Sequence, residues 1–198
     1  LPNINILDNI SSANNFDPLV PARYARWIDA VGKMEASGDE RLFYRLLNLM
    51  GVSRVEYLND DDPAGVVFQQ LENSQQVRWV GCAIPARDEE EAWDFVLSEN
   101  SDFEQEVIIE NADGAPDMPC NHAKGPVDVT VVDRVPNQIT MSVNSLQAGW
   151  LVVSDVWYPG WKAEIDGKPT PIFRANYLFR AVNVPSGGHT VTFTYSPR

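Results

Sequence analysis

The sequence predicts an α+β protein whose C-terminal part is an antiparallel, jelly-roll-like β-sandwich. Apolar residues recur at helical spacing in residues 20–98, whereas they alternate with polar residues from residue 127 onward. Turns that contain Gly or Pro separate the alternating segments, and many short strands at regular spacing are typical of sandwiches. We therefore expect a mixed helix and strand subdomain over residues 1–110 and a sandwich portion over residues 111–198, joined in one compact unit.

Two helices are expected early in the chain. Residues 1–19 are polar and rich in Asn, which predicts a loop or an extended lead-in. Apolar side chains then fall on one helical face over residues 20–32, and Pro21 suits a first helical turn. A second helix is expected from Asp39, a favourable N-cap, to a stop at Gly51.

The middle of the chain is expected to combine short strands with a third helix. Asp88 and Glu91 have the spacing of a capping box, which predicts a helix that begins there and ends before Asn100. Short apolar runs bounded by polar, Gly or Pro residues predict strands over residues 52–58, 66–71, 76–84 and 107–109.

Loop residues are expected over 111–126, and strands dominate after them. The dipeptide Asp166-Gly167 predicts a two-residue β-hairpin, and the Gly-rich stretch 185–188 predicts the turn before the last strand. The expected strands cover residues 127–131, 139–143, 151–153, 161–165, 171–173, 178–184 and 190–195.

Charge and hydropathy exclude several classes of function. The formal net charge is -13, so the surface repels phosphate backbones, and nucleic acid is not an expected partner. No apolar run reaches the ~18 residues that a membrane-spanning helix needs. The chain begins at Leu1 without a signal-peptide pattern, and we expect it to be part of a larger protein.

The two cysteines, Cys82 and Cys120, allow two interpretations. They form one disulfide, which would stabilise the fold by about 3–4 kcal/mol, or they are two separate buried thiols. A zinc site with His122 is disfavoured because no fourth ligand is evident. The acidic run 59–62 lacks the spacing of a calcium loop and favours a solvated turn, so no metal or cofactor is expected.

Three segments together resemble the bacterial YfhO-like membrane protein family. They are residues 16–24, residues 46–55, and Tyr158-Pro159-Gly160-Trp161 with the later Asp166-Gly167, Asn176 and Gly188-His189. Phe16 stands for the usual aromatic residue of the family, whereas Arg54 departs from the pattern, since an aromatic is more usual there.

The membrane portion of these proteins resembles C-type glycosyltransferases, and their presumed catalytic acidic residues lie in that portion. The resemblance therefore implies an extracytoplasmic domain of a bacterial cell-membrane protein, and it assigns no catalytic residue to this chain. An extracytoplasmic location would favour the disulfide between Cys82 and Cys120.

An aromatic cluster beside Pro159-Gly160 is the candidate binding site. Aromatic rings pack against the apolar faces of sugars, and Asn or Arg side chains supply hydrogen bonds, which suggests a carbohydrate site. The predicted contact residues are Tyr158, Trp161, Arg174 and Asn176, with Trp157 and Tyr177 beside them. In the alternative interpretation, which the strand alternation favours, the rings belong to the core and Pro-Gly is only a turn.

No nucleophile elbow, P-loop or dinucleotide-binding motif occurs, and neither His122 nor His189 belongs to a catalytic pattern. The prediction is a non-catalytic accessory domain in cell-envelope glycan or glycolipid assembly, with weak carbohydrate binding. Its expected partners are the membrane-spanning remainder of the parent protein and a glycan or lipid-linked sugar. The alternatives are a part of a membrane glycosyltransferase that contributes acceptor contacts, and a purely structural cap for assembly.

Overall fold

The computed structural model describes residues 21–58, 65–72, 74–111, 120 and 125–197. The chain divides into two compact units, residues 1–76 and residues 77–198. The boundary suggested by the sequence, between residues 110 and 111, falls inside the second unit. The reason is that strands from both sides of residue 110 pair in one sheet.

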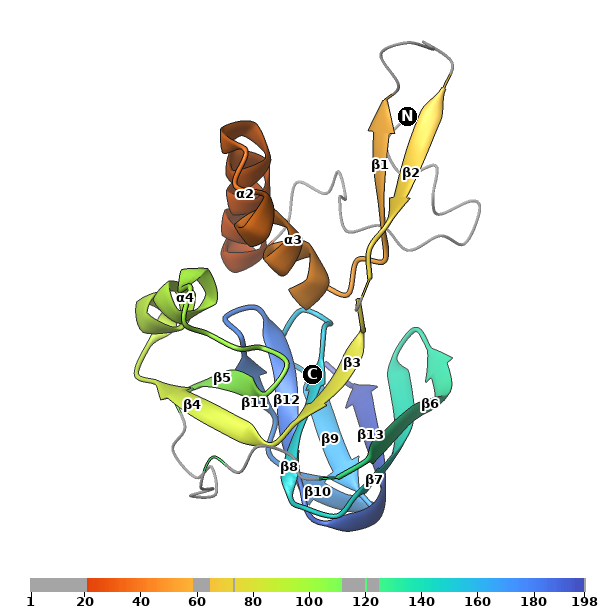
Figure 1. Ribbon diagram of the computed structural model, residues 1–198. Helices are drawn as coiled ribbons and strands as arrows, with labels where there is room; N and C mark the ends of the chain where they lie inside the picture. Colours follow the sequence, from red (N-terminus) through yellow and green to blue (C-terminus); the bar gives the residue numbers. More distant parts are fainter. Residues whose placement is uncertain (1–20, 59–64, 73, 112–119, 121–124, 198) are drawn as a thin grey trace. The chain divides into compact units, whose positions relative to one another are not determined.

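The part of the first unit that the structure describes contains two helices and a pair of antiparallel strands (Figure 1). They are α2 (Ala22–Ser37), α3 (Glu40–Leu49), β1 (Arg54–Leu58) and β2 (Val66–Gln70). The N-cap at Asp39 is confirmed, since its carboxylate accepts a hydrogen bond from the Leu42 amide at 3.1 Å. The first helix continues past Gly32 and ends at Gly38, whose φ of 75° is the left-handed conformation of a helix stop.

The second unit contains helix α4 (Glu89–Leu97) and all the remaining strands. The capping residue Asp88 is confirmed, since it accepts from the Glu91 amide at 2.9 Å. Glu91 reaches back one residue further than a capping box requires and accepts from the Arg87 amide at 2.6 Å. The strands are β3 (Val77–Val80), β4 (Cys82–Ala86), β5 (Glu106–Glu110), β6 (Val127–Val135), β7 (Gln138–Ser145), β8 (Gly149–Val153), β9 (Trp161–Ile165), β10 (Lys168–Thr170), β11 (Phe173–Ala175), β12 (Phe179–Val184) and β13 (Gly187–Tyr195).

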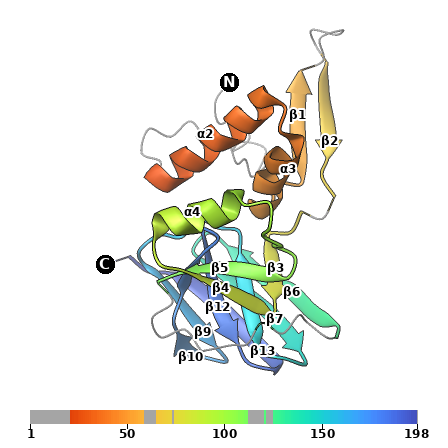
Figure 2. The same cartoon turned by 60° about the vertical axis from the view of Figure 1, so that its left-hand side comes forward.

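These strands form two sheets. The five-stranded sheet has the order β10-β9-β13-β7-β6, and all its neighbouring strands are antiparallel. The six-stranded sheet has the order β3-β8-β12-β11-β5-β4, and only the β4–β5 pair is parallel. Helix α4 packs against β4 and β5 (Figure 2).

One predicted strand is corrected. Residues 76–84 were expected to form a single strand, but they divide at Gly81 into β3 and β4. These two strands occupy opposite edges of the six-stranded sheet although one residue separates them. The sheet must therefore curl until its two edges approach each other.

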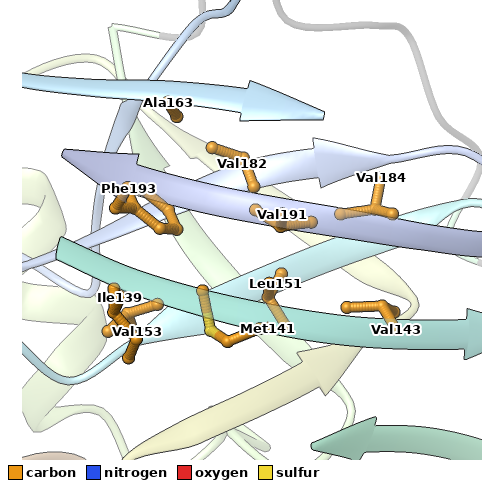
Figure 3. Close-up of a cluster of buried hydrophobic side chains, with 10 residues drawn as sticks. All are labelled: Ile139, Met141, Val143, Leu151, Val153, Ala163, Val182, Val184, Val191 and Phe193. Carbon is orange, nitrogen blue, oxygen red and sulfur yellow. The ribbon is translucent and has the colours of Figure 1, made fainter. Parts of the chain in front are cut away.

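The two sheets enclose a shared apolar core (Figure 3). It draws side chains from β7, β9 and β13 of one sheet and from β8 and β12 of the other: Ile139, Met141, Val143, Leu151, Val153, Ala163, Val182, Val184, Val191 and Phe193. Every residue of β8 is buried. Leu151 and Val153 belong to the shared core, whereas Trp150 and Val152 belong to a second cluster of buried residues within the curled six-stranded sheet. The α+β fold with a C-terminal sandwich is confirmed.

The Asp166-Gly167 hairpin is also confirmed. Ile165 and Lys168 are register partners in the antiparallel β9–β10 pair. Asp166 and Gly167 have φ values of 52° and 74°, as a two-residue turn that matches strand twist requires.

Candidate functional site

An open pocket of about 360 Å³ lies beside β9 and β10 in the second unit. Its walls are the end of the β8–β9 connection, strand β9, and residues in and just after strand β10. We call it the aromatic groove, and its lining residues are Trp157, Tyr158, Pro159, Gly160, Trp161, Lys162, Ala163, Glu164, Pro169, Thr170 and Ile172.

Backbone contacts hold the segment that carries the aromatic residues of the groove. The Trp157 amide donates to the carbonyl of Leu178, and the Ser196 amide donates to the carbonyl of Gly160, each at 2.8 Å. Gly160 has a φ of 104°, and a Cβ there would lie 3.1 Å from the ring of Tyr195. The turn therefore needs glycine both for its backbone conformation and for space.

Trp161 is partly buried and packs against side chains that do not line the groove. Its ring lies 5.3 Å from the ring of its cross-strand partner Tyr195. The guanidinium carbon of Arg180 lies 3.6 Å from the centre of the Trp161 ring, which is a close cation–π contact.

Arg180, the second residue of β12, is a buried cation. Its side chain is 1% exposed, and its Nη2 donates to Asp155 at 2.7 Å. The other oxygen of Asp155 accepts from Arg134 at 2.9 Å. Burial lowers the pKa of Arg180 to about 10, although Asp155 opposes that shift, so the guanidinium stays charged at neutral pH.

Trp157 has an arginine beside it as well. The guanidinium carbon of Arg174 lies 4.1 Å from the centre of its ring. Arg174 and Arg180 are register partners on β11 and β12. Two neighbouring arginines thus each contact one tryptophan of the groove.

Comparison with protein families identifies the part of the chain that contains the groove. Residues 121–198 match the profile of the family described as bacterial membrane protein YfhO. Residues 121–198 are therefore similar to this family, and we call them the YfhO-like domain on the ground of that similarity. No curated protein and no solved structure matches the chain. The groove, Asp155 and all three arginines around it lie in the YfhO-like domain, whereas the motifs in residues 16–24 and 46–55 lie outside the match.

Three of the four predicted contact residues gather at this place in the YfhO-like domain. Tyr158 and Trp161 line the groove, and the guanidinium of Arg174 contacts the ring of Trp157, which also lines it. Tyr158 is 51% exposed, so its ring is not a core residue. Trp161 is a partly buried residue that packs against the core, as the alternative interpretation of the aromatic cluster expects.

Asn176 does not line the groove. It is 2% exposed, and its side-chain oxygen accepts a hydrogen bond from the Ile108 amide at 2.8 Å. The backbone amide of Asn176 donates to the carbonyl of Ile108, also at 2.8 Å. These bonds join β5 to the β11–β12 turn, where only Ala175 and Ile109 are register partners. Tyr177 is buried against Trp93 of α4, with ring centres 4.7 Å apart.

Sequence reasoning missed Arg180 and Asp155. The available signal was an arginine within a mostly apolar strand, Phe179–Val184. Such a residue is almost never fully buried without a partner, so it predicts a nearby carboxylate. The pattern cannot say which carboxylate, because Asp155 lies 25 residues away.

A second polar pair of the YfhO-like domain closes the β9–β10 turn. His189 Nδ1 lies 2.7 Å from Asp166 Oδ2, and Nε2 lies 3.2 Å from the carbonyl of Ser186. The hydrogen bond with Asp166 raises the pKa of His189, and the same bond lowers the pKa of Asp166. Asp166 also accepts from the Thr190 amide at 2.8 Å, so this pair stabilises a turn.

Cys82 and Cys120 form a disulfide, so their sulfurs are not available as thiolate ligands. Within the described ranges, no three His, Cys, Asp or Glu residues are grouped to hold a metal ion. The acidic run 59–62 and His122 lie outside the described residues.

Among the helices that the structure describes, none is both long and apolar enough to cross a membrane.

Proposed function

We propose that the chain is a non-catalytic accessory domain of a bacterial membrane protein, and that it binds carbohydrate weakly in the aromatic groove. The similarity of residues 121–198 to a membrane protein family supports the attachment to a membrane protein. The observation that carries the binding proposal is the open pocket of about 360 Å³ whose wall contains Trp157, Tyr158 and Trp161.

The groove has the size and chemistry of a small sugar site. Ligand pockets range over roughly 300–1,000 Å³, and a pocket near the lower end accommodates about one or two sugar rings. The exposed ring of Tyr158 offers a flat apolar surface, while Lys162 and Glu164 supply a donor and an acceptor of hydrogen bonds. Binding that rests on a few such contacts is expected to have a Kd in the millimolar range, about -4 kcal/mol.

The proposed location is the extracytoplasmic face of the cell membrane, and the proposed role is to hold a glycan or lipid-linked sugar near the membrane. The disulfide between Cys82 and Cys120 supports this side of the membrane, because disulfides persist in oxidising compartments. In the alternative form of this proposal, the domain contributes acceptor contacts to a glycosyltransferase, and the catalytic residues lie in the membrane portion of the parent protein.

Titration of the 198-residue chain with envelope oligosaccharides tests the proposal. The resonances of the tryptophan indole N–H groups report on the groove, and those of Trp157 and Trp161 are assigned from phenylalanine variants. Saturable shifts of these two resonances at millimolar sugar are expected. Unchanged spectra up to tens of millimolar sugar would exclude a carbohydrate site in this groove.

A second candidate, an assembly role, rests on β6. This nine-residue strand is an edge of its sheet and exposes Val131, Val132 and Val135. An exposed apolar edge strand is a template for pairing with another strand, here the same strand of a second copy. Light scattering should then show a dimer that Val132→Lys dissociates, whereas a monomer at high concentration would remove this candidate.

A further inference from the structure

The ring of Trp161 is in contact with a charged side chain from the other sheet. Trp161 begins β9 in the five-stranded sheet, whereas Arg180 belongs to β12 in the six-stranded sheet. The guanidinium carbon of Arg180 lies 3.6 Å from the centre of the indole ring and 5.2 Å from the centre of the Phe193 ring. One buried cation thus contacts a tryptophan that lines the groove and a phenylalanine of the shared core.

The guanidinium of Arg180 is held in a defined place. Its Nη2 donates to Asp155 at 2.7 Å, and the Arg180 side chain is 1% exposed. Asp155 lies two residues after the end of β8, on the connection that continues into the groove at Trp157. Because a guanidinium is planar, a hydrogen bond to one of its nitrogens also limits how its plane can turn against the indole ring.

Stability alone does not account for an arginine at this position. Burial of a charge is costly, and an apolar side chain of similar volume often replaces a buried ion pair without loss of stability. The Nε and Nη1 atoms of Arg180 are buried and have no hydrogen-bond acceptor within the described ranges, which adds to the cost. The contact through which this arginine reaches the groove is the Trp161 ring.

We infer that Arg180 is a positioning residue of the aromatic groove, which holds the Trp161 ring in one orientation before a sugar binds. The inference rests on the proposed function, because it explains how the same groove is prepared for its ligand. A ring that is already ordered loses less rotational freedom when a ligand packs on it, so affinity rises without a new contact. Loss of the arginine is therefore expected to raise the Kd about three- to fivefold, less than loss of the ring itself.

Arg180→Met tests the inference, because methionine keeps a long side chain in the core but removes the planar cation. Nitrogen relaxation of the Trp161 indole N–H group in the 198-residue chain measures the order of the ring before sugar is added. The buried Trp150 indole, 1% exposed, is the internal reference. The two indoles should be equally ordered in the wild type, whereas in Arg180→Met the order of Trp161 should fall below that of Trp150. The Kd for glucose and for N-acetylglucosamine should rise in the same variant.

Two further variants separate the planar cation from other effects. Arg180→Lys keeps the charge but not the planar group, so it should restore only part of the order of the Trp161 indole. Arg87→Met makes the first substitution at an arginine whose side chain is 83% exposed and pairs with Glu91 outside the groove. It should change neither the order of Trp161 nor the Kd.

Unchanged order of Trp161 and an unchanged Kd in Arg180→Met would overturn the inference, and a lower midpoint of unfolding beside them would show that Arg180 only supports the fold. If Arg180→Met does not fold, Asp155→Asn decides in its place, because it keeps the arginine but weakens the bond that holds the guanidinium. A Trp161 indole as ordered in Asp155→Asn as in the wild type would then overturn the inference.

The failure of the proposed function is distinguishable from the failure of this inference. An absence of shifts with both sugars in the wild type would count against a sugar site in the groove. The order of the Trp161 indole is measured without sugar, so the comparison of the wild type with Arg180→Met would still decide whether the arginine holds the ring.

Discussion

Tyr158 and Trp161 are the residues on which the proposed sugar contact depends. Tyr158 is 51% exposed in the groove wall, and Trp161 lies over Arg180. Truncation of either ring to alanine is expected to weaken sugar binding about five- to thirtyfold, because stacking on one ring contributes about 1–2 kcal/mol to the binding free energy. Titration calorimetry or the indole resonance of Trp157 measures the change.

Phe68→Ala is the matched control for these truncations. Phe68 is a 63% exposed aromatic residue on β2, outside the groove. Its truncation should leave the Kd for sugar unchanged. A loss of affinity in Phe68→Ala equal to that in Tyr158→Ala would show that the sugar binds exposed rings without preference for the groove.

Asp155 is expected to stabilise the fold because it neutralises a buried charge. Asp155→Asn leaves Arg180, whose side chain is 1% exposed, without an anionic partner. The expected loss is about 1–3 kcal/mol in the free energy of unfolding, less than for a fully buried pair, since the Asp155 side chain is 32% exposed. Urea denaturation measures the difference.

Asp29→Asn is the corresponding change in an exposed pair. The carboxylate of Asp29 binds Lys33 on α2, and both side chains are more than 60% exposed, at 61% and 68%. Its loss is expected to cost less than about 0.5 kcal/mol. Equal effects of the two substitutions would mean that Arg180 does not depend on Asp155.

The His189–Asp166 pair predicts a defined dependence of stability on pH. The pKa of His189 is raised from 6.5, so its contribution is complete below pH 6.5 and is lost as pH rises through the folded-state pKa. The pKa of Asp166 is lowered from 3.8, so its contribution is present above pH 3.8 and is lost as pH falls through its folded-state pKa. The pair therefore stabilises most between these two ordinary values.

Comparison of the wild-type chain with His189→Gln tests this window. The difference in midpoint temperature should be largest between pH 3.8 and pH 6.5, and it should diminish as the pH rises through the folded-state pKa of His189 and the ring loses its proton. NMR titration of the His189 ring gives the folded-state pKa directly. A ring that titrates below 6.5 would contradict the hydrogen bond as described.

At the scale of elements, strand β8 is so closely packed that its first residue has no space for a side chain. A Cβ at Gly149, the first residue of β8, would overlap the indole ring of Trp79 on the neighbouring strand β3. Gly149→Ala is therefore expected to displace Trp79 and to destabilise the second unit by about 1–3 kcal/mol. The midpoint of thermal unfolding measures the effect.

Gly188 in β13 provides the control for that substitution. A Cβ at Gly188 meets nothing within 4 Å, so Gly188→Ala should leave the midpoint unchanged or raise it slightly. A similar fall in both variants would indicate that the cost belongs to glycine in any strand and not to the contact with Trp79.

The elements also show where local sequence information suffices. The caps Asp39 and Asp88 and the hairpin at Asp166-Gly167 were predictable, because each depends on residues within a few positions along the chain. The division of residues 77–86 at Gly81 was not, since β3 pairs with β8 and β4 pairs with β5. The choice of partner strand depends on segments that are distant in sequence.

At the scale of the whole molecule, the disulfide connects β4 to Cys120, a residue that is distant in sequence. Cys82 and Cys120 are separated by 38 residues, and closure of such a loop stabilises a domain by about 3–4 kcal/mol through the entropy of the unfolded chain. Reduction should lower the midpoint of unfolding of residues 77–198, and the Cys82→Ala/Cys120→Ala variant should match the reduced wild type. A thiol titration of the denatured, unreduced chain should find no free thiol.

The acidic character of the chain and its C-terminal strands, in which apolar and polar residues alternate, could be predicted from the sequence alone. So could the helix caps, the Asp166-Gly167 turn and the aromatic cluster around Pro159-Gly160, because these features depend on composition or on near neighbours. Only the tertiary structure decided that Asn176 joins β5 to a turn, that Arg180 is buried over Trp161, and that one carboxylate serves two arginines. Those arrangements arise when strands far apart in the sequence pair and curl, and a one-dimensional pattern does not record which strands meet.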